Sequence, residues 1–215
     1  QDFNWPVPGE TPFIDFPNYS STLEELKEKY ADRIQVLKGI ELGLAPGNEK
    51  EIQDLLSKES FDFIIGSCHV VSGMDPYYPN FWENKNDRQA FEEYFKATLE
   101  GLESFSGIHT LGHLDYIVRY SPNKDSNYSV SDYTDLLDEI LRFIIQNEIC
   151  LEINTASFGK GFTYPHPHPD ILERYRELGG ELVTIGSDAH KAEQIGLGFD
   201  RVKELIEQYQ LKVFQ

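Results

Sequence analysis

Short apolar runs that alternate with amphipathic segments constrain the fold of this chain more than any other feature. The runs are rich in β-branched and aromatic side chains and lie at residues 34–42, 61–67, 108–112, 149–153, 181–186 and 211–214. Nearly continuous apolar runs of this length are typical of strands buried on both faces, as in a parallel sheet. Because the segments between them have helical periodicity, the alternation predicts an α/β fold with right-handed crossover connections.

The predicted helices lie at residues 22–30, 87–105, 131–147, 169–178 and 199–209. Thr22 and Glu25 have the spacing of a capping box, and the pair Gly179-Gly180 is typical of a helix end. A closed barrel of eight strand–helix units takes about 250 residues. The 215 residues therefore predict one domain over residues 1–215, built as most of such a barrel or as an open parallel sheet.

The charge and composition exclude several classes of protein. The chain has 37 acidic and 19 basic residues, a formal net charge of −18, which repels polyphosphate backbones and argues against a nucleic-acid partner. Solubility alone is the alternative explanation of this charge. No apolar run approaches the ~20 residues of a membrane span. Cys68 directly follows one apolar run and Cys150 lies in another; both are interpreted as buried thiols, so we expect a cytoplasmic protein.

Side chains that bind metals follow the predicted strands. Parallel strands open at their carboxyl ends on one face, where α/β proteins build their sites. The candidates at these strand ends are Glu41, His69, His113, Asp188 and His190. Carboxylates and imidazoles are ligands for zinc, manganese or iron, so the pattern predicts a metal site. The alternative for each residue is a structural role, such as a hydrogen-bonded histidine or an aspartate that caps the next helix.

The remaining histidines are not predicted to bind a metal. His109 lies inside a predicted strand, where a position in the core is expected. His166 and His168 alternate with prolines, which stiffen the loop, and a position on the surface or at the rim of the site is expected.

Two cations are candidates for phosphate binding in this acidic chain. Arg119 follows His113 in the same loop, and the guanidinium fork of arginine matches the geometry of a phosphate. Lys160 follows the fourth predicted strand between two glycines. A solvated surface charge is the alternative for both residues.

Five short motifs at the strand ends carry a resemblance to a known family. They read Gly-Ile-Glu41, Gly-Ser-Cys-His69, Leu-Gly-His113-Leu-Asp, Glu-Ile-Asn154-Thr and Gly-Ser-Asp188-Ala-His190. In this order they resemble the later motifs of the PHP (polymerase and histidinol phosphatase) family, most closely its histidinol-phosphatase branch. The resemblance extends through nearly the whole chain and implies a distorted, TIM-like (β/α)7 barrel.

The resemblance also implies a cluster of up to three divalent metal ions, such as zinc, manganese or iron. In this cluster Glu41 bridges two ions, and His69 and His113 complete one site. Asp188 serves a second ion and His190 a third.

The reaction that the resemblance implies is hydrolysis of L-histidinol phosphate to L-histidinol and phosphate in histidine biosynthesis. Asp188 and His190 are then catalytic, and Arg119, Lys160 and Asn154 contact this small substrate. Two alternatives stay open: a PHP phosphoesterase with another small phosphate ester, and a non-catalytic metal-binding homologue. The sequence makes no prediction of the oligomeric state.

The chain also departs from the family pattern. The family opens with a His-x-His motif and a later Thr-Asp/Glu-His element, whereas no histidine precedes His69 here. We therefore expect the first strands of the barrel to be missing from this chain, through truncation, an unseen segment or natural degeneration. The expected consequences are one tightly bound metal, low stability or self-association, and slow hydrolysis. Lys160 also lies near the position where the family pattern leads us to expect an arginine.

Overall fold

The computed structural model describes residues 1–3, 5–6 and 13–214, and its centre is one parallel sheet. The sheet has six strands, each of which pairs with the next one along the chain. The strands are β1 (Gly39–Gly43), β2 (Phe63–Ser67), β3 (Thr110–Leu111), β4 (Cys150–Asn154), β5 (Leu182–Gly186) and β6 (Lys212–Val213). Each predicted apolar run overlaps one of these strands, so the predicted parallel α/β fold is confirmed.

The sheet is strongly curved. Thr110 of β3 and Thr184 of β5 are separated by the whole of β4, yet their Oγ1 atoms are 2.9 Å apart. The ring centroids of Phe63 in β2 and Phe214, just after β6, are 6.3 Å apart. Contacts between strands that are not neighbours require a sheet that bends toward a barrel, in agreement with the predicted distorted barrel.

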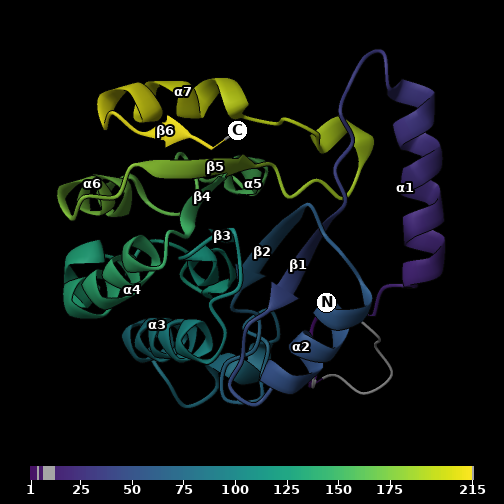
Figure 1. Cartoon of the computed structure of the whole chain (residues 1–215). Coiled ribbons are helices and arrows are strands. Elements are labelled where there is room, and N and C mark those ends of the chain that lie inside the picture. Colours follow the sequence, from purple (N-terminus) through teal and green to yellow (C-terminus); the bar gives the residue numbers. More distant parts are fainter. Residues whose placement is uncertain (4, 7–12, 215) are drawn as a thin grey trace.

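Helices surround the convex side of the sheet, as Figure 1 shows. They are α2 (Glu49–Lys58), α3 (Asp87–Ser104), α4 (Thr134–Gln146), α6 (Pro169–Glu177) and α7 (Phe199–Gln208), with a short α5 (Ala156–Gly159) after β4. Helix α1 (Phe16–Tyr30) stands apart from this arc, and none of its described residues is buried. The hydroxyl of Tyr19 donates to the carbonyl oxygen of Gly39 at 2.7 Å, which ties α1 to β1.

The apolar stripe of α4 is buried as its spacing predicts. Leu137, Ile140, Leu141 and Ile144 all lie in the core between the helix and the sheet. This part of the core therefore lies between the helices and the convex face of the sheet.

Ile140→Ala is expected to destabilise the fold. The side chain is fully buried, so its truncation leaves a cavity and should lower the free energy of unfolding by about 2–5 kcal/mol. Ile195→Ala is the matched control, because Ile195 is 75% exposed and its truncation should change stability by less than about 0.5 kcal/mol. Urea denaturation followed by circular dichroism measures both changes, and equal effects would contradict the burial of Ile140.

The first helix begins earlier than predicted. Oδ1 of Asp15 accepts the backbone N–H of Asn18 at 3.3 Å, and Pro17 suits the first turn. Thr22 consequently lies within α1, where it caps nothing.

One further boundary was predicted incorrectly, and one helix was missed. The run at 34–42 forms a strand only from Gly39 onward, and Ile34 and Leu37 are 62% and 52% exposed. Helix α2 was not predicted, because Ile52 is the one buried residue among those described in it. A single buried position gives too weak a periodic signal.

The expectation that His109 lies in the core is wrong. His109 is exposed just before β3, where its ring stacks on Phe63 with centroids 5.3 Å apart. Its Nδ1 accepts the backbone N–H of Ile64 at 2.8 Å, so the imidazole satisfies a backbone donor near the amino-terminal end of β2.

Cys68 and Cys150 are free and buried, as predicted. Burial raises the pKa of the Cys68 thiol to about 12, which keeps the sulfur protonated. In the described ranges of the chain, no helix combines the length and apolar character that a bilayer crossing requires.

Candidate active site

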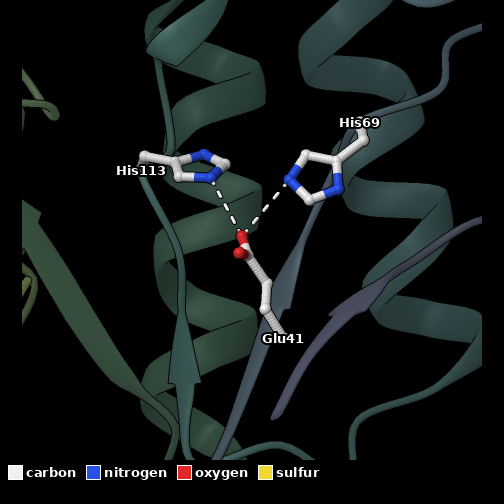
Figure 2. A group of neighbouring side chains, drawn as sticks. All are labelled: Glu41, His69 and His113. Atoms are coloured by element: carbon white, nitrogen blue, oxygen red, sulfur yellow. Dashed lines mark hydrogen bonds and ion pairs between the residues drawn. The ribbon is translucent and has the colours of Figure 1, made fainter. Parts of the chain in front are cut away.

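Three of the predicted metal ligands converge at the carboxyl ends of adjacent strands, as Figure 2 shows. Glu41 lies in β1, His69 follows β2 and His113 follows β3. The Nε2 atoms of His69 and His113 lie 3.2 and 3.1 Å from Oε1 of Glu41. We call these residues the metal triad, because one ligand atom from each lies within 4.8 Å of the others. Two imidazoles and one carboxylate form a zinc-type donor set, so the residues fit a divalent metal.

Neighbouring polar groups hold the metal triad in place. Nδ1 of His69 is 2.9 Å from Oδ1 of Asp2, and Ser67 Oγ donates to Glu41 Oε1 at 2.6 Å. The backbone N–H of His113 donates to Oε2 of Glu152 at 2.8 Å. The contact of His69 Nδ1 with Asp2 involves the second ring nitrogen of this ligand, and such a bond fixes the ring orientation and the tautomer, whereas the bond of His113 to Glu152 holds its backbone. Sequence reasoning did not single out Asp2, Ser67 or Glu152.

The backbone is strained at two predicted site residues. His113 has a φ of 21° and Asp188 a φ of 47°, although neither is glycine. Such conformations persist only where the surrounding structure imposes them, and they concentrate at functional sites. A side chain at Gly186 would collide with Glu152, because a Cβ at this position would lie 2.0 Å from Oε1 of Glu152.

Electrostatics couples the members of the metal triad. Burial alone would lower the pKa of His69, but the charge of Glu41 and the hydrogen bond with Asp2 outweigh burial and raise this pKa to about 10. Burial likewise opposes ionisation of Glu41, yet the charge of His69 and the hydrogen bonds with both histidines hold the pKa of Glu41 well below its usual range. In the metal-free protein the imidazolium of His69 therefore faces a carboxylate.

The affinity of the metal triad for a divalent metal should increase with pH. Because the pKa of His69 is raised to about 10, its ring carries a proton at neutral pH that the metal must displace. Displacement of one proton should lower the Kd for Mn²⁺ about tenfold for each unit between pH 6 and 8. Calorimetric titration in buffers of different ionisation enthalpy measures this slope and the released proton.

His168→Gln provides the control for this titration, because His168 lies at the start of α6, outside the metal triad. It should leave the slope unchanged. A wild-type Kd that does not vary with pH would show that His69 is already deprotonated.

Arg119 lies beside the metal triad with only 8% of its side chain exposed. Its guanidinium sits over the rings of Tyr116 and Tyr120, 5.0 and 5.2 Å from their centroids. The Nη2 atom donates to Oδ2 of Asp188 at 3.5 Å, and Nε is buried without a hydrogen-bond partner among the described residues. Arg119 is therefore not the solvated surface charge of the alternative interpretation.

Asp188 and His190 share a cavity of about 280 Å³ with the metal triad and Arg119. His190 is 82% exposed, and its Nδ1 lies 2.9 Å from the carbonyl oxygen of Asp188 and 3.7 Å from Oδ1 of the same residue. Within the described part of the chain, neither residue belongs to the compact ligand cluster of the metal triad. Their assignments as metal ligands and catalytic groups stay predictions.

Lys160 lines a second cavity of about 370 Å³. The two cavities share four lining residues, which are Arg119, Tyr120, Asp188 and His190. Lys160 therefore lines a cavity that adjoins the cavity of the metal triad at these four residues. Its predicted contact with substrate remains a prediction.

Asn154 is placed differently from the other candidates. Its side chain is buried, and Nδ2 donates to Oε2 of Glu152 at 3.2 Å while Oδ1 accepts the backbone N–H of Ala156 at 3.1 Å. It lines neither of the two cavities. The structure places Asn154 next to Glu152, which also binds the backbone of His113. The predicted contact of Asn154 with substrate stays a prediction.

The expectation that His166 lies on the surface or at the rim is wrong. Its side chain is completely buried, and Nδ1 lies 2.8 Å from Oδ1 of Asp115. The other oxygen of Asp115 accepts the hydroxyl of Tyr128 and the backbone N–H of His168. The loop folds back because the backbone of His166 pairs with that of Asn154. Asp115, two residues after His113 in the same motif, was the available signal.

A comparison with protein families tests the family membership that these motifs suggest. The model of the PHP domain matches residues 9–156. The chain belongs to the PHP family. The predicted resemblance is thereby confirmed on a match that includes the whole metal triad.

Curated relatives and solved structures agree with this membership. The chain is 36% identical over 211 residues to a probable histidinol-phosphatase of Clostridium acetobutylicum, covering 98% of this chain and 80% of the relative. It is 31% identical over 200 residues to the histidinol-phosphatase of Lactococcus lactis, covering 93% and 74%.

The crystal structure of histidinol phosphate phosphatase from Lactococcus lactis, complexed with zinc, L-histidinol and phosphate, superposes with a TM-score of 0.89 and 30% identity. The superposition covers 99% of this chain and 80% of the Lactococcus chain. A putative histidinol phosphatase from Listeria monocytogenes has the same fold, with a TM-score of 0.72 at 23% identity, and covers 87% of this chain and 75% of that one.

Proposed function

We propose that the protein is a metal-dependent histidinol-phosphatase that hydrolyses L-histidinol phosphate to L-histidinol and phosphate. The observation that carries this proposal is a zinc-type donor set and a buried arginine in one cavity, in a chain whose relatives are named for this reaction. The chain would act as one PHP domain over residues 1–215, in the cytoplasm and in histidine biosynthesis.

The metal triad would hold the first divalent ion, with Asp188 and His190 as ligands of further ions in a cluster of up to three. When bound, such ions polarise the phosphoryl oxygens and lower the pKa of water. Zinc, manganese and iron all suit imidazole and carboxylate ligands.

The cations of the chain have a separate task in this proposal. Arg119 can present two parallel N–H donors to the phosphoryl oxygens, and Lys160 adds a point charge from the second cavity. The two tyrosine rings and Asp188 hold the guanidinium in place before substrate binds, which reduces the cost of reorganisation in the transition state.

Phosphate release tests the proposal. The purified protein, loaded with Zn²⁺ or Mn²⁺, is expected to hydrolyse L-histidinol phosphate with a higher kcat/KM than a panel of other phosphomonoesters. A chelator should abolish this activity, and elemental analysis before treatment gives the number of ions per chain. Preference for another ester would replace the substrate, and metal binding without turnover on any ester would leave a non-catalytic homologue.

A further inference from the structure

Thr155 ends the fourth strand-end motif and has no part in the proposed chemistry. It directly follows β4 and is completely buried. Because β4 lies between β3 and β5, its carboxyl end adjoins the loop that carries His113 on one side and the loop that carries Asp188 and His190 on the other. A buried hydroxyl at this position needs hydrogen-bond partners, and those partners show which segments it holds.

Thr155 binds both ends of the loop between β5 and α7. This loop, residues 187–198, contains both predicted catalytic residues (Figure 1). The backbone N–H of Thr155 donates to the carbonyl oxygen of Gly186, directly before the loop, at 2.8 Å. Its hydroxyl lies 2.5 Å from the carbonyl oxygen of Leu197, near the other end of the loop, and 3.1 Å from that of Gly186. One side chain therefore joins the two ends of the loop to the end of β4.

Other hydrogen bonds of the loop connect parts of the loop to each other. The backbone N–H of His190 donates to Oε1 of Gln194 at 2.9 Å, and that of Gly196 donates to Oγ of Ser187 at 3.2 Å. Such bonds set the internal shape of the loop but not its position on the barrel. The bonds of Thr155 set that position.

The backbone of Asp188 shows why the position matters. Its φ of 47° is a conformation that persists only where the surrounding structure imposes it. The contact of Asp188 Oδ2 with Nη2 of Arg119, at 3.5 Å, is long for a hydrogen bond and restrains the backbone little. The carbonyl group that Thr155 holds belongs to Gly186, two residues before Asp188.

The same strand end supports the metal triad. Oε2 of Glu152 accepts the backbone N–H of His113 at 2.8 Å, and Nδ2 of Asn154 donates to the same oxygen at 3.2 Å. Glu152 and Thr155 are three residues apart on one buried strand end. This strand end therefore sets the distance between the metal triad and the loop that faces it.

We infer that Thr155 is a positioning residue whose hydroxyl holds the loop at residues 187–198, so that Asp188 and His190 face the metal triad. The catalytic part of this inference rests on the proposed function. The position of the loop is a property of the metal-free chain and can be measured without turnover.

Hydrogen exchange of the metal-free protein, followed by mass spectrometry, measures this position. Thr155→Val keeps the shape of the side chain but removes the hydroxyl, whereas Thr155→Ser keeps the hydroxyl. Amides of residues 187–198 are expected to exchange at least about tenfold faster in Thr155→Val, because loss of a buried hydrogen bond favours local opening. They should exchange at nearly the wild-type rate in Thr155→Ser.

Thr98→Val is the matched control, because Thr98 is also buried and its hydroxyl donates to the carbonyl oxygen of Tyr94 within α3 at 2.9 Å. It should lose a similar amount of stability without a specific effect on the loop. Equal acceleration of loop exchange in Thr98→Val and Thr155→Val would reduce Thr155 to a general contribution to stability and overturn the inference.

Steady-state kinetics of the metal-loaded protein gives the second measurement. Thr155→Val should lower kcat for L-histidinol phosphate at least about tenfold and change KM by less than about threefold, because the displaced residues act on the reacting group. Thr155→Ser should restore kcat to within about threefold of wild type, and Thr98→Val should not lower it.

The two measurements separate the inference from the proposed function. If wild type hydrolyses histidinol phosphate but Thr155→Val keeps either the exchange rate of the loop or kcat, the inference is overturned and the proposed function stands. If wild type hydrolyses no phosphate ester while Thr155→Val alone loosens the loop, the positioning of the loop stands and the proposed function fails. Absence of both hydrolysis in wild type and loosening in Thr155→Val overturns both.

Discussion

Glu41→Ala is expected to abolish tight metal binding and phosphate release together. The carboxylate is the point on which both imidazoles of the metal triad converge, so its removal leaves His69 and His113 without the anionic ligand between them. Loss of several kcal/mol of charge stabilisation corresponds to a fall in kcat/KM of roughly a thousandfold or more. Elemental analysis after gel filtration and a phosphate-release assay measure the two effects on one sample.

The matched control is Glu28→Ala, which removes an exposed carboxylate from α1. It should change neither metal content nor rate. Glu41→Gln adds a further comparison, because it keeps the shape of the side chain but not its charge, and should behave nearly as Glu41→Ala does. Turnover of Glu41→Ala within about threefold of wild type, with unchanged metal content, would exclude Glu41 from the site.

The metal triad could be predicted because each member depends on local sequence and on a general rule of topology. A buried strand followed directly by an imidazole or carboxylate can be identified without knowledge of long-range contacts. In a parallel sheet the carboxyl ends of successive strands meet on one face, and β1, β2 and β3 are neighbours here. His69 lies 28 positions after Glu41, and His113 lies 44 positions after His69. Both imidazoles nevertheless come within hydrogen-bonding range of Oε1 of Glu41.

The supporting groups could not be predicted in this way. Asp2 is 67 residues from His69, and Glu152 is 39 residues from His113, and neither has a local pattern that marks its partner. The burial of His166 depends on Asp115, 51 residues earlier, and on a loop that folds back onto the end of β4. Proline-rich sequence indicates a stiff loop, but the direction of the loop is set by tertiary contacts.

Errors at the ends of elements have a different cause. His109 was expected in the core because it lies inside a predicted strand, yet β3 begins only at Thr110. A shift of one position along a strand moves a side chain to the other face or out of the sheet. Element bounds are therefore less predictable than the existence of the elements, and His109 lies at such a bound.

Arg119→Lys is expected to lower kcat/KM for histidinol phosphate strongly while the fold stays intact. The structure holds the guanidinium over two tyrosine rings and next to Asp188, an arrangement that suits a planar fork and not a flexible ammonium. Loss of a charged hydrogen bond in the transition state is worth about 1–3 kcal/mol, or roughly 5- to 150-fold in kcat/KM. Arg119→Ala should cost at least as much.

The effect should appear in kcat more than in KM if Arg119 binds the phosphoryl group most tightly as charge spreads in the transition state. Arg142→Lys is the control, because Arg142 is 56% exposed and forms a surface ion pair with Asp138. Steady-state kinetics on the three variants, with melting temperatures to verify folding, gives the comparison. Unchanged kinetics in both Arg119 variants would assign the residue to structural support of the tyrosine rings and leave Lys160 as the cation that faces the phosphate.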